Sequence, residues 1–279
     1  MPVVVVTDSS ARLPADLAAR YGISVVPLHI LVGESDLSDG VDDIPADIHE
    51  RHATTAGATP DELCRAYERA LTASAGDGVV AVHISAALSS TLSAAEQAAG
   101  QLGDRVQVVD SRSAAMGTGF IALAAAQAAR SGADLDAVAQ AARVAVGSTH
   151  AFIVVHRLDN LRRSGRIGGA AAWLGTALSL KPLLRIDGGK LVLAQRVRTA
   201  SKAVATMLDQ VCAVAGTAAV SIAVHHVDNP DGAQEVACAL AQRLPAARPA
   251  IITDLGPVLA LHVGAGALGV VVSVDAPQD

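Results

Sequence analysis

Residues 3–10, "VVVVTDSS", decide the fold, because four valines and a threonine run directly into an aspartate and two serines. An apolar, β-branched run that ends in polar turn residues predicts a buried strand over residues 3–7. Runs of the same kind at 78–84 and 106–110 also end in polar turns. Alanine- and leucine-rich helical patterns lie between these runs, and such alternation is typical of α/β proteins with a parallel sheet.

The rest of the first half fits this pattern. A fourth strand is predicted over 24–30, and the start "TPDE" (59–62) places a threonine cap, a proline and a glutamate at the beginning of a helix. The acidic segment 34–50 is expected to form a loop whose aspartates cap a helix near residue 45. The helices are predicted over 13–21, 60–75, 89–101, 113–130 and 134–147.

The second half changes character near residue 150. The segment 181–197 reads as two strands around an Asp-Gly-Gly turn, which predicts an antiparallel hairpin. The other strands are predicted over 151–156, 219–226, 250–255 and 267–274, and the helices over 199–214 and 231–243. We therefore predict two α/β lobes: residues 1–149 with a parallel sheet flanked by helices, and residues 150–279 with a mixed sheet and helices.

The composition of the chain argues against several classes of function and indicates where the protein acts. The formal net charge is −6 and aromatic residues make up 2% of the chain, which argues against nucleic acid as a partner. The three cysteines are widely spaced and predict small buried residues in a reducing compartment rather than disulfides. The N-terminus is not of the signal-peptide type, and the apolar runs are too short to span a membrane, so we expect a soluble, cytoplasmic protein.

Two motif matches do not indicate a cofactor or a metal. The stretch "GAGALG" (264–269) has the glycine spacing of a dinucleotide site, but a predicted strand follows it, so a tight glycine turn is expected. "HERH" (49–52) lacks the spacing of a zinc protease helix and is expected to be an exposed polar helix. The adjacent His225 and His226 are expected on opposite faces of a strand. We predict no cofactor and no metal.

Hydroxyl-rich turns follow three first-lobe strands, at 8–10, 85–93 and 110–113. In open α/β sheets, ligands collect at the carboxyl ends of the strands, and helix N-termini there favour anions. Serine and threonine are also ordinary helix caps. A further hydroxyl-rich stretch lies at 53–59. Taken together, these turns support two interpretations about equally well: a site for a carboxylate or another anion, and plain helix capping.

Several stretches resemble the DegV family in order and spacing, among them "VVTDSSARLP", "TTAGATPDEL", "HISAALSSTLSAAEQAA", "LRRSGRIGG" and "LHVGAGALG". The resemblance covers essentially the whole chain. It implies a bacterial protein of two α/β lobes that buries a long-chain fatty acid in an internal tunnel. It further implies that this chain itself performs no catalysis. The fatty-acid carboxyl group would be presented to a separate ATP-dependent fatty acid kinase subunit, which forms the acyl phosphate used in phospholipid synthesis. Transient membrane contact would serve lipid exchange.

The resemblance also implies the ligand-binding residues. Thr55, Ser89 and His262 match the family's carboxyl-holding threonine, serine and histidine, and Ser90, which replaces a glycine, lies beside them. The residues 56–58, Ala-Gly-Ala, are smaller than the family's Ser-Gln-Pro, so we expect a smaller and more mobile loop after Thr55.

The same resemblance gives a role to the arginine-rich stretch "DNLRRSGRIG" (159–168). Arg166, with Arg196 and Arg198, is implied to lie on a basic surface that contacts the kinase subunit or the phosphates it handles. Without the resemblance, solvated arginines near helix ends would be the simplest interpretation.

Two enzyme classes remain as alternatives. Ser89 and His262 are residue types that form a nucleophile–base pair in acyl hydrolases, although the chain has no nucleophile elbow. The second alternative is a subunit of a kinase that acts on small hydroxyketones, because such proteins use a histidine that acts on the substrate. A DNA-binding regulator is not supported, since the net charge is negative and no helix-turn-helix pattern is found.

Overall fold

The computed structural model describes residues 2–45, 48, 51–167 and 181–275. The chain divides into two compact units, Met1–Gly147 and Ser148–Asp279. The division lies two residues before the boundary expected from the sequence.

The first unit is built on a parallel sheet of strand order β2-β1-β6-β7. Its strands are β1 (Val4–Asp8), β2 (Ser24–Val26), β6 (Val79–His83) and β7 (Val106–Asp110). All five residues of the central strand β6 are buried, as expected for a parallel strand covered on both faces. The predicted parallel sheet is confirmed.

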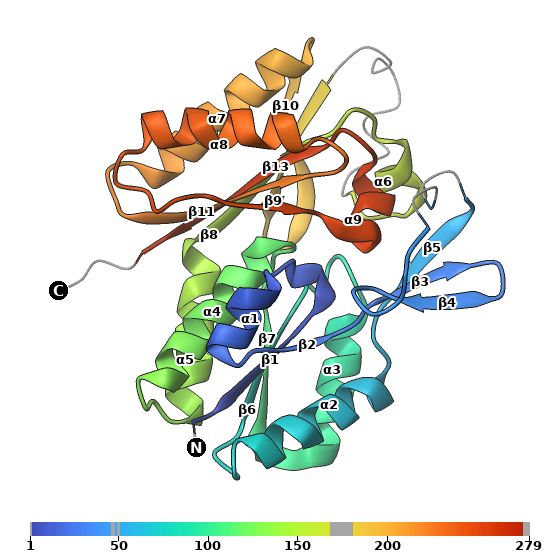
Figure 1. Cartoon of the computed structure of the whole chain (residues 1–279), viewed down its shortest axis with the longest axis vertical. Coiled ribbons are helices and arrows are strands. Elements are labelled where there is room, and N and C mark those ends of the chain that lie inside the picture. Colours follow the sequence, from blue (N-terminus) through green and yellow to red (C-terminus); the bar gives the residue numbers. More distant parts are fainter. Residues whose placement is uncertain (1, 46–47, 49–50, 168–180, 276–279) are drawn as a thin grey trace. The chain divides into compact units, whose positions relative to one another are not determined.

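Helices cover both faces of this sheet (Figure 1). On one side lie α2 (Pro60–Ala73) and α3 (Thr91–Leu102), and on the other α1 (Ala15–Tyr21), α4 (Met116–Arg130) and α5 (Leu135–Ser148). The predicted capping box of α2 is present, because Thr59 and Glu62 bond to each other's backbone N–H groups. The parallel layer therefore agrees with the sequence pattern.

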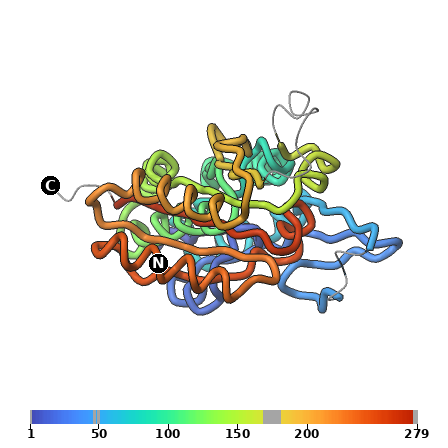
Figure 2. Tube along the Cα trace, turned by 90° about the horizontal axis from the view of Figure 1, so that it is seen from above, coloured from blue at the N-terminus to red at the C-terminus, as the bar shows by residue number. Residues whose placement is uncertain are grey.

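A small antiparallel sheet in the first unit was not predicted. It consists of β3 (His29–Val32), β4 (Ser35–Ser38) and β5 (Ala53–Ala56) in the order β4-β3-β5. The single strand predicted over 24–30 is divided into two: β2 ends before Pro27, which lacks an N–H group, and β3 begins at His29 and joins the separate sheet. Figure 2 shows the hairpin of β3 and β4 (blue) reaching away from the helices of this unit.

The acidic segment is also not the simple loop that was predicted. β4 lies within it, and residues 43–45 are not helical. Of the helix predicted near residue 45, residues 46–47 and 49–50 lie outside the described residues, and Ile48 donates to the Pro45 carbonyl in a 3-10 turn. The exposed helix expected at "HERH" is wrong for Arg51 and His52, which are exposed but not helical.

The second unit has a six-stranded mixed sheet of order β10-β9-β8-β13-β11-β12. Its strands are β8 (Thr149–Val154), β9 (Lys181–Asp187), β10 (Lys190–Val197), β11 (Val220–His226), β12 (Ile251–Asp254) and β13 (Leu268–Val274). All neighbouring strands are antiparallel except β11 and β12, so the predicted mixed sheet is confirmed. Gly188 and Gly189, at φ 55° and 82°, make the predicted hairpin turn.

Helices α7 (Ala200–Ala215) and α8 (Pro230–Arg243) pack side by side on this sheet (Figure 1). Their buried faces form one apolar core with the sheet, to which Phe152, Met207, Val224 and Leu240 belong. Two short helices, α6 (Asp159–Arg163) and α9 (Gly256–Val263), contact each other beside it. α9 was not predicted from the sequence. Among the described residues, no helix combines the length and apolar character that crossing a membrane requires.

Candidate functional site

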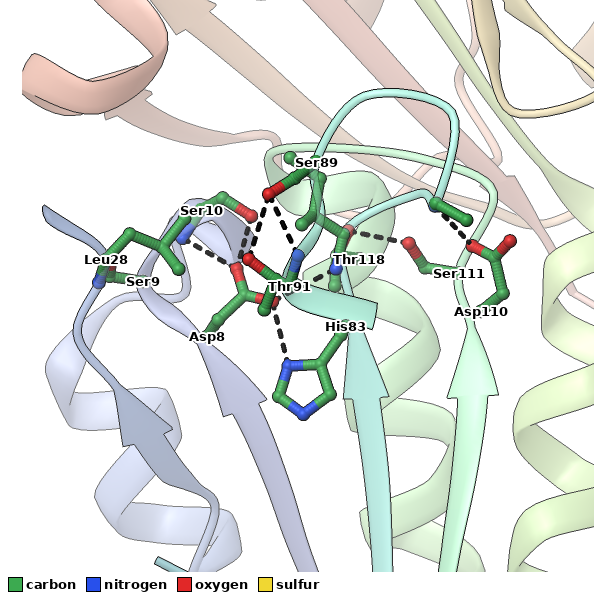
Figure 3. Close-up of polar contacts among 12 residues, drawn as sticks. Asp8, Ser9, Ser10, Leu28, His83, Ser89, Thr91, Asp110, Ser111 and Thr118 are labelled. Atoms are coloured by element: carbon green, nitrogen blue, oxygen red, sulfur yellow. Dashed lines mark hydrogen bonds and ion pairs between the residues drawn. The ribbon is translucent and has the colours of Figure 1, made fainter. Parts of the chain in front are cut away.

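Ser89 lies in the turn that leads from β6 into α3, at the carboxyl edge of the parallel sheet. Its half-buried hydroxyl is 2.9 Å from the Thr91 hydroxyl and accepts the Thr91 N–H at 3.2 Å (Figure 3). Ser90 holds the cap position itself, but it is exposed and its side chain makes no capping bond. Ser89 therefore caps α3 through a hydroxyl that keeps further hydrogen-bonding capacity.

The chain that follows Thr55 approaches this turn from the small sheet. Thr55 lies in β5 opposite Ile30, and Gly57, two residues later, packs against the start of α3. A Cβ atom added at Gly57 would lie only 2.6 Å from the Thr91 hydroxyl and 3.2 Å from the Thr91 backbone nitrogen. The absence of a side chain at Gly57 therefore lets the loop after Thr55 contact the turn that holds Ser89.

A buried polar network supports the same edge of the sheet. Asp8, at the end of β1, accepts hydrogen bonds from His83 Nδ1 at 2.9 Å, from the Ile84 N–H at 3.0 Å, and from the N–H and hydroxyl of Ser10 (Figure 3). The other ring nitrogen of His83 lies 2.8 Å from the hydroxyl of Tyr67 on α2. The network joins β1, β6 and α2 beneath the Ser89 turn.

The charge of this network is set by Asp8. Burial alone would raise the pKa of Asp8, but the interaction with His83 and the Ser10 and Ile84 donors hold that pKa below its ordinary value. Burial, together with the nearby Asp8 carboxylate, raises the pKa of Tyr67 far above its usual range. Asp8 is thus an ionised, fully satisfied anchor. From the sequence, Asp8 was recognised only as part of a polar turn, and His83 and Tyr67 were not identified.

The serine turn after β7 has a structural role. The Ser111 hydroxyl lies 3.0 Å from the Thr118 hydroxyl (Figure 3). It also accepts a hydrogen bond from the Ser113 N–H. Ser111, Ser113 and Thr118 are all buried. The Ser111 and Thr118 hydroxyls therefore connect the turn to the first turn of α4. α4 itself begins after Ala115 without a side-chain cap, so the helix capping considered from the sequence is not found at this turn.

In the second unit, His262 lies in the last turn of α9 and is half-buried. Burial lowers the pKa of His262 to about 4, and the positive charge of Arg166 contributes to the shift. Arg166, also half-buried, donates to the Ser164 carbonyl, and the next residue, Ile167, forms a bridge with Leu191. His262 and Arg166 are thus brought close enough to interact electrostatically.

The glycine turn after His262 packs on the segment between β8 and α6. Gly266, at φ 76°, lies against the His156 ring, since an added Cβ would be 2.9 Å from a ring carbon. Gly264 faces the Asn160 side chain in the same way, at 3.6 Å. The sequence "GAGALG" therefore forms the predicted tight turn before β13. Neither His156 nor Asn160 was singled out from the sequence.

The two other predicted interface arginines lie at the end of β10. Arg196 pairs with Pro182 across the hairpin, Arg198 follows the strand, and both are exposed.

No group of three metal-ligating side chains is found within the described part of the chain. His225 is buried and His226 partly buried. The expectation of three buried cysteines is wrong, because Cys238 is exposed on α8 and Cys64 and Cys212 are only partly buried.

These features define an α/β protein of two units with hydroxyl-bearing turns at a parallel-sheet edge in one and a histidine–arginine pair in the other. Residues 2–275 match the model of the DegV family, described as a family of uncharacterised proteins. The chain belongs to the DegV family.

Named relatives agree with this membership. A DegV domain-containing protein of Mycobacterium tuberculosis is 66% identical over 276 residues, which cover 99% of each chain. A DegV family protein from Thermus thermophilus, whose crystal structure is described as one of fatty acid binding, has a TM-score of 0.89 at 33% identity and covers 99% of this chain and 100% of its own. DegV from Bacillus subtilis, described as a fatty acid binding protein, has a TM-score of 0.89 at 27% identity with the same coverage.

Proposed function

We propose that this protein binds a long-chain fatty acid in an internal tunnel and presents its carboxyl group to a separate kinase subunit. The observation that carries the proposal is the contact of the Thr55 loop with the Ser89 turn, in a chain whose structural relatives from T. thermophilus and B. subtilis bind fatty acids. A carboxyl group that leaves water needs donors, and each hydrogen bond to a charged group contributes roughly 1.5–3 kcal/mol. Burial of the acyl chain adds about 0.8 kcal/mol per methylene.

In this proposal Thr55, Ser89, Ser90 and His262 hold the carboxyl group. The hydroxyls act as donors, and His262 acts as a neutral ring, since its pKa of about 4 keeps it uncharged near neutral pH. A neutral histidine offers one hydrogen bond without placing a full charge beside the ligand.

We further propose that the chain itself performs no catalysis and that it acts in the cytoplasm. An ATP-dependent fatty acid kinase subunit would convert the presented carboxyl group to the acyl phosphate used in phospholipid synthesis. Arg166, Arg196 and Arg198 would contact that subunit, and transient membrane contact would exchange the lipid.

Native mass spectrometry of the protein purified from cells tests the ligand. Wild type should carry a non-covalent fatty acid, and Ser89→Ala should carry less, while Ser93→Ala, an exposed serine on the same helix, should match wild type. A covalent acyl adduct on Ser89 would instead favour the hydrolase. Equal lipid content in wild type and Ser89→Ala would contradict the assignment of Ser89.

Acyl-phosphate formation with the kinase subunit tests the arginines. Arg166→Ala and Arg198→Ala should slow the reaction while fatty-acid content stays constant, and added salt should have a similar effect because exposed charges are screened. Arg243→Ala, on the exposed side of α8, is the control. Normal rates in both variants would remove the interface role.

A further inference from the structure

A buried histidine of the small antiparallel sheet lies between two carboxylates from different elements. His29 Nδ1 is 2.8 Å from an oxygen of Asp36 on β4, and His29 Nε2 is 3.1 Å from an oxygen of Glu62 on α2. The His29 side chain is 9% exposed, whereas those of Asp36 and Glu62 are 58% and 32% exposed. One ring therefore connects the small sheet to a helix that packs on the parallel sheet.

Both contacts require a protonated ring. A carboxylate can only accept, so donation to Asp36 and Glu62 together needs an N–H group on each ring nitrogen of His29. The same Glu62 oxygen accepts from the Thr59 N–H at 2.8 Å and from its hydroxyl at 2.7 Å, which fixes Glu62 in the capping box. Burial opposes a charge on His29, but the bonds to Asp36 and Glu62 and their negative charges outweigh it and raise the pKa of His29.

β5, the third strand of the small sheet, adds no charge beside His29. The β5 residue paired with His29 is Ala56, which has no ionisable group, and Asp36 and Glu62 are the groups whose charges act on the ring. The protonation state of His29 is therefore governed by one carboxylate from the sheet and one from α2.

The position of Thr55 depends on how this sheet is attached. Side chains alternate along a strand, so Thr55 lies on the face of the sheet opposite to His29, with the fully buried Ile30. The small sheet has three strands of four residues, and β4 is mostly polar with no buried residue, so the sheet has little of the hydrophobic face that a sheet stable by itself requires. Its contacts with the rest of the unit must hold it, and two of these are the His29–Glu62 bond and the packing of Gly57 on Thr91.

We propose that His29 is a positioning residue for the fatty-acid site: its doubly bonded ring fixes the small sheet against α2 and so holds Thr55 beside the Ser89 turn. This inference rests on the proposed function, because Thr55 matters only if it contacts the ligand. Loss of the ring proton leaves a lone pair facing a carboxylate, which removes one of the two bonds. The attachment is complete below the ordinary pKa of histidine, about 6.5, and is lost as the pH rises through the raised pKa of His29.

A fluorescent long-chain fatty acid, cis-parinaric acid, measures the effect. Its dissociation constant is determined from pH 5.5 to 9 for wild type, His29→Gln and the control His52→Gln, an exposed histidine just before β5. The probe's own ionisation affects all three proteins alike, so the ratio of variant to wild type is the readout. For His29→Gln this ratio should be about tenfold, equivalent to about 1.4 kcal/mol, at low pH and approach one at high pH. For His52→Gln it should stay near one.

Two further results distinguish positioning from general stability. Glu62→Gln keeps an acceptor for the Thr59 cap but removes one negative charge beside His29, so it should move the pH profile to lower pH. A His29→Gln ratio that is the same at every pH, or equal to one throughout, would overturn the proposal.

Amide hydrogen exchange without ligand separates this inference from the proposed function. Protection of residues 53–56 should fall with rising pH in wild type but not in His29→Gln. If wild type binds the probe and this protection is independent of pH and of His29, the proposal is overturned while the proposed function stands. If wild type does not bind the probe at any pH, the proposed function fails, and the positioning role fails with it.

Discussion

Replacing Gly57 by alanine would disturb the contact that brings the Thr55 loop to the Ser89 turn. The new Cβ atom would lie 2.6 Å from the Thr91 hydroxyl and 3.2 Å from its backbone nitrogen. Non-bonded heavy atoms are most favourable at about 3.5–4.0 Å, so the loop has to move by about 1 Å. Thr91 cannot yield easily, because it is fully buried, β-branched and bonded to Ser89.

The expected loss of stability is the difference of two terms. Overpacking of a well-packed site costs about 1–3 kcal/mol. The backbone at Gly57 is compatible with alanine, so the smaller entropy of the unfolded chain offsets about 0.4–1 kcal/mol of this. We expect Gly57→Ala to be destabilised by about 0.5–2 kcal/mol and, because the loop is displaced, to bind the fatty acid about tenfold more weakly.

Thermal unfolding and binding of cis-parinaric acid check this, with Gly100→Ala as the matched control. Gly100 lies in α3, the same helix as Thr91, and has no atom within 4 Å of an added Cβ. Alanine there should stabilise the helix by up to about 1 kcal/mol without changing affinity. If Gly57→Ala were as stable as Gly100→Ala and bound the probe like wild type, the contact between Gly57 and Thr91 would not determine the position of Thr55.

Three further predictions follow from the charges. The pKa of Asp8 is lowered in the folded state, so the ionised carboxylate stabilises the fold above the unfolded-state pKa, and this contribution is lost as the pH falls through the folded-state pKa. In Asp8→Asn, the free energy of unfolding, measured with urea, should therefore decrease less at acidic pH than in wild type. The His262 ring, with a pKa of about 4, should show no titration by NMR between pH 6 and 8. Because the unfolded chain binds this proton at the ordinary histidine pKa of about 6.5, the free energy of unfolding should decrease as the pH falls from about 6.5 to 4. Arg166→Gln should raise that pKa toward the ordinary value, and an unchanged pKa would show that burial alone sets it.

Long apolar runs made the parallel layer predictable from the sequence. Four consecutive valines or a run such as 78–84 are stable as strands only when buried on both faces, and this demands helices on each side. The small sheet gave no such signal. Its strands have four residues each, and β4, "SDLS", is mostly polar, so its hydrogen bonds depend on pairing partners that a local pattern does not identify.

The candidate site, too, could be predicted only in part from the sequence. The Ser89 turn was found because a serine-rich segment follows a clear strand. The partners that support the turn lie far away in the sequence: Asp8 and His83 are 75 residues apart, and Gly57 meets Thr91 only through packing. A glycine that is needed because another backbone approaches it cannot be distinguished by sequence from one that merely terminates a strand.

If the protein presents a carboxyl group, as we propose, its site needs hydrogen-bond donors that leave the carboxylate charged. The hydroxyls of Thr55 and Ser89 are neutral, and His262 is neutral near pH 7 because its pKa is about 4. A protonated histidine would give its proton to, or pair tightly with, the carboxylate and so reduce its ability to attack a phosphoryl group. In the proposed site, neutral donors would orient the carboxylate and leave its charge in place, while burial of the acyl chain would supply about 0.8 kcal/mol per methylene. The ligand would then be held by its chain and remain reactive at its carboxyl group.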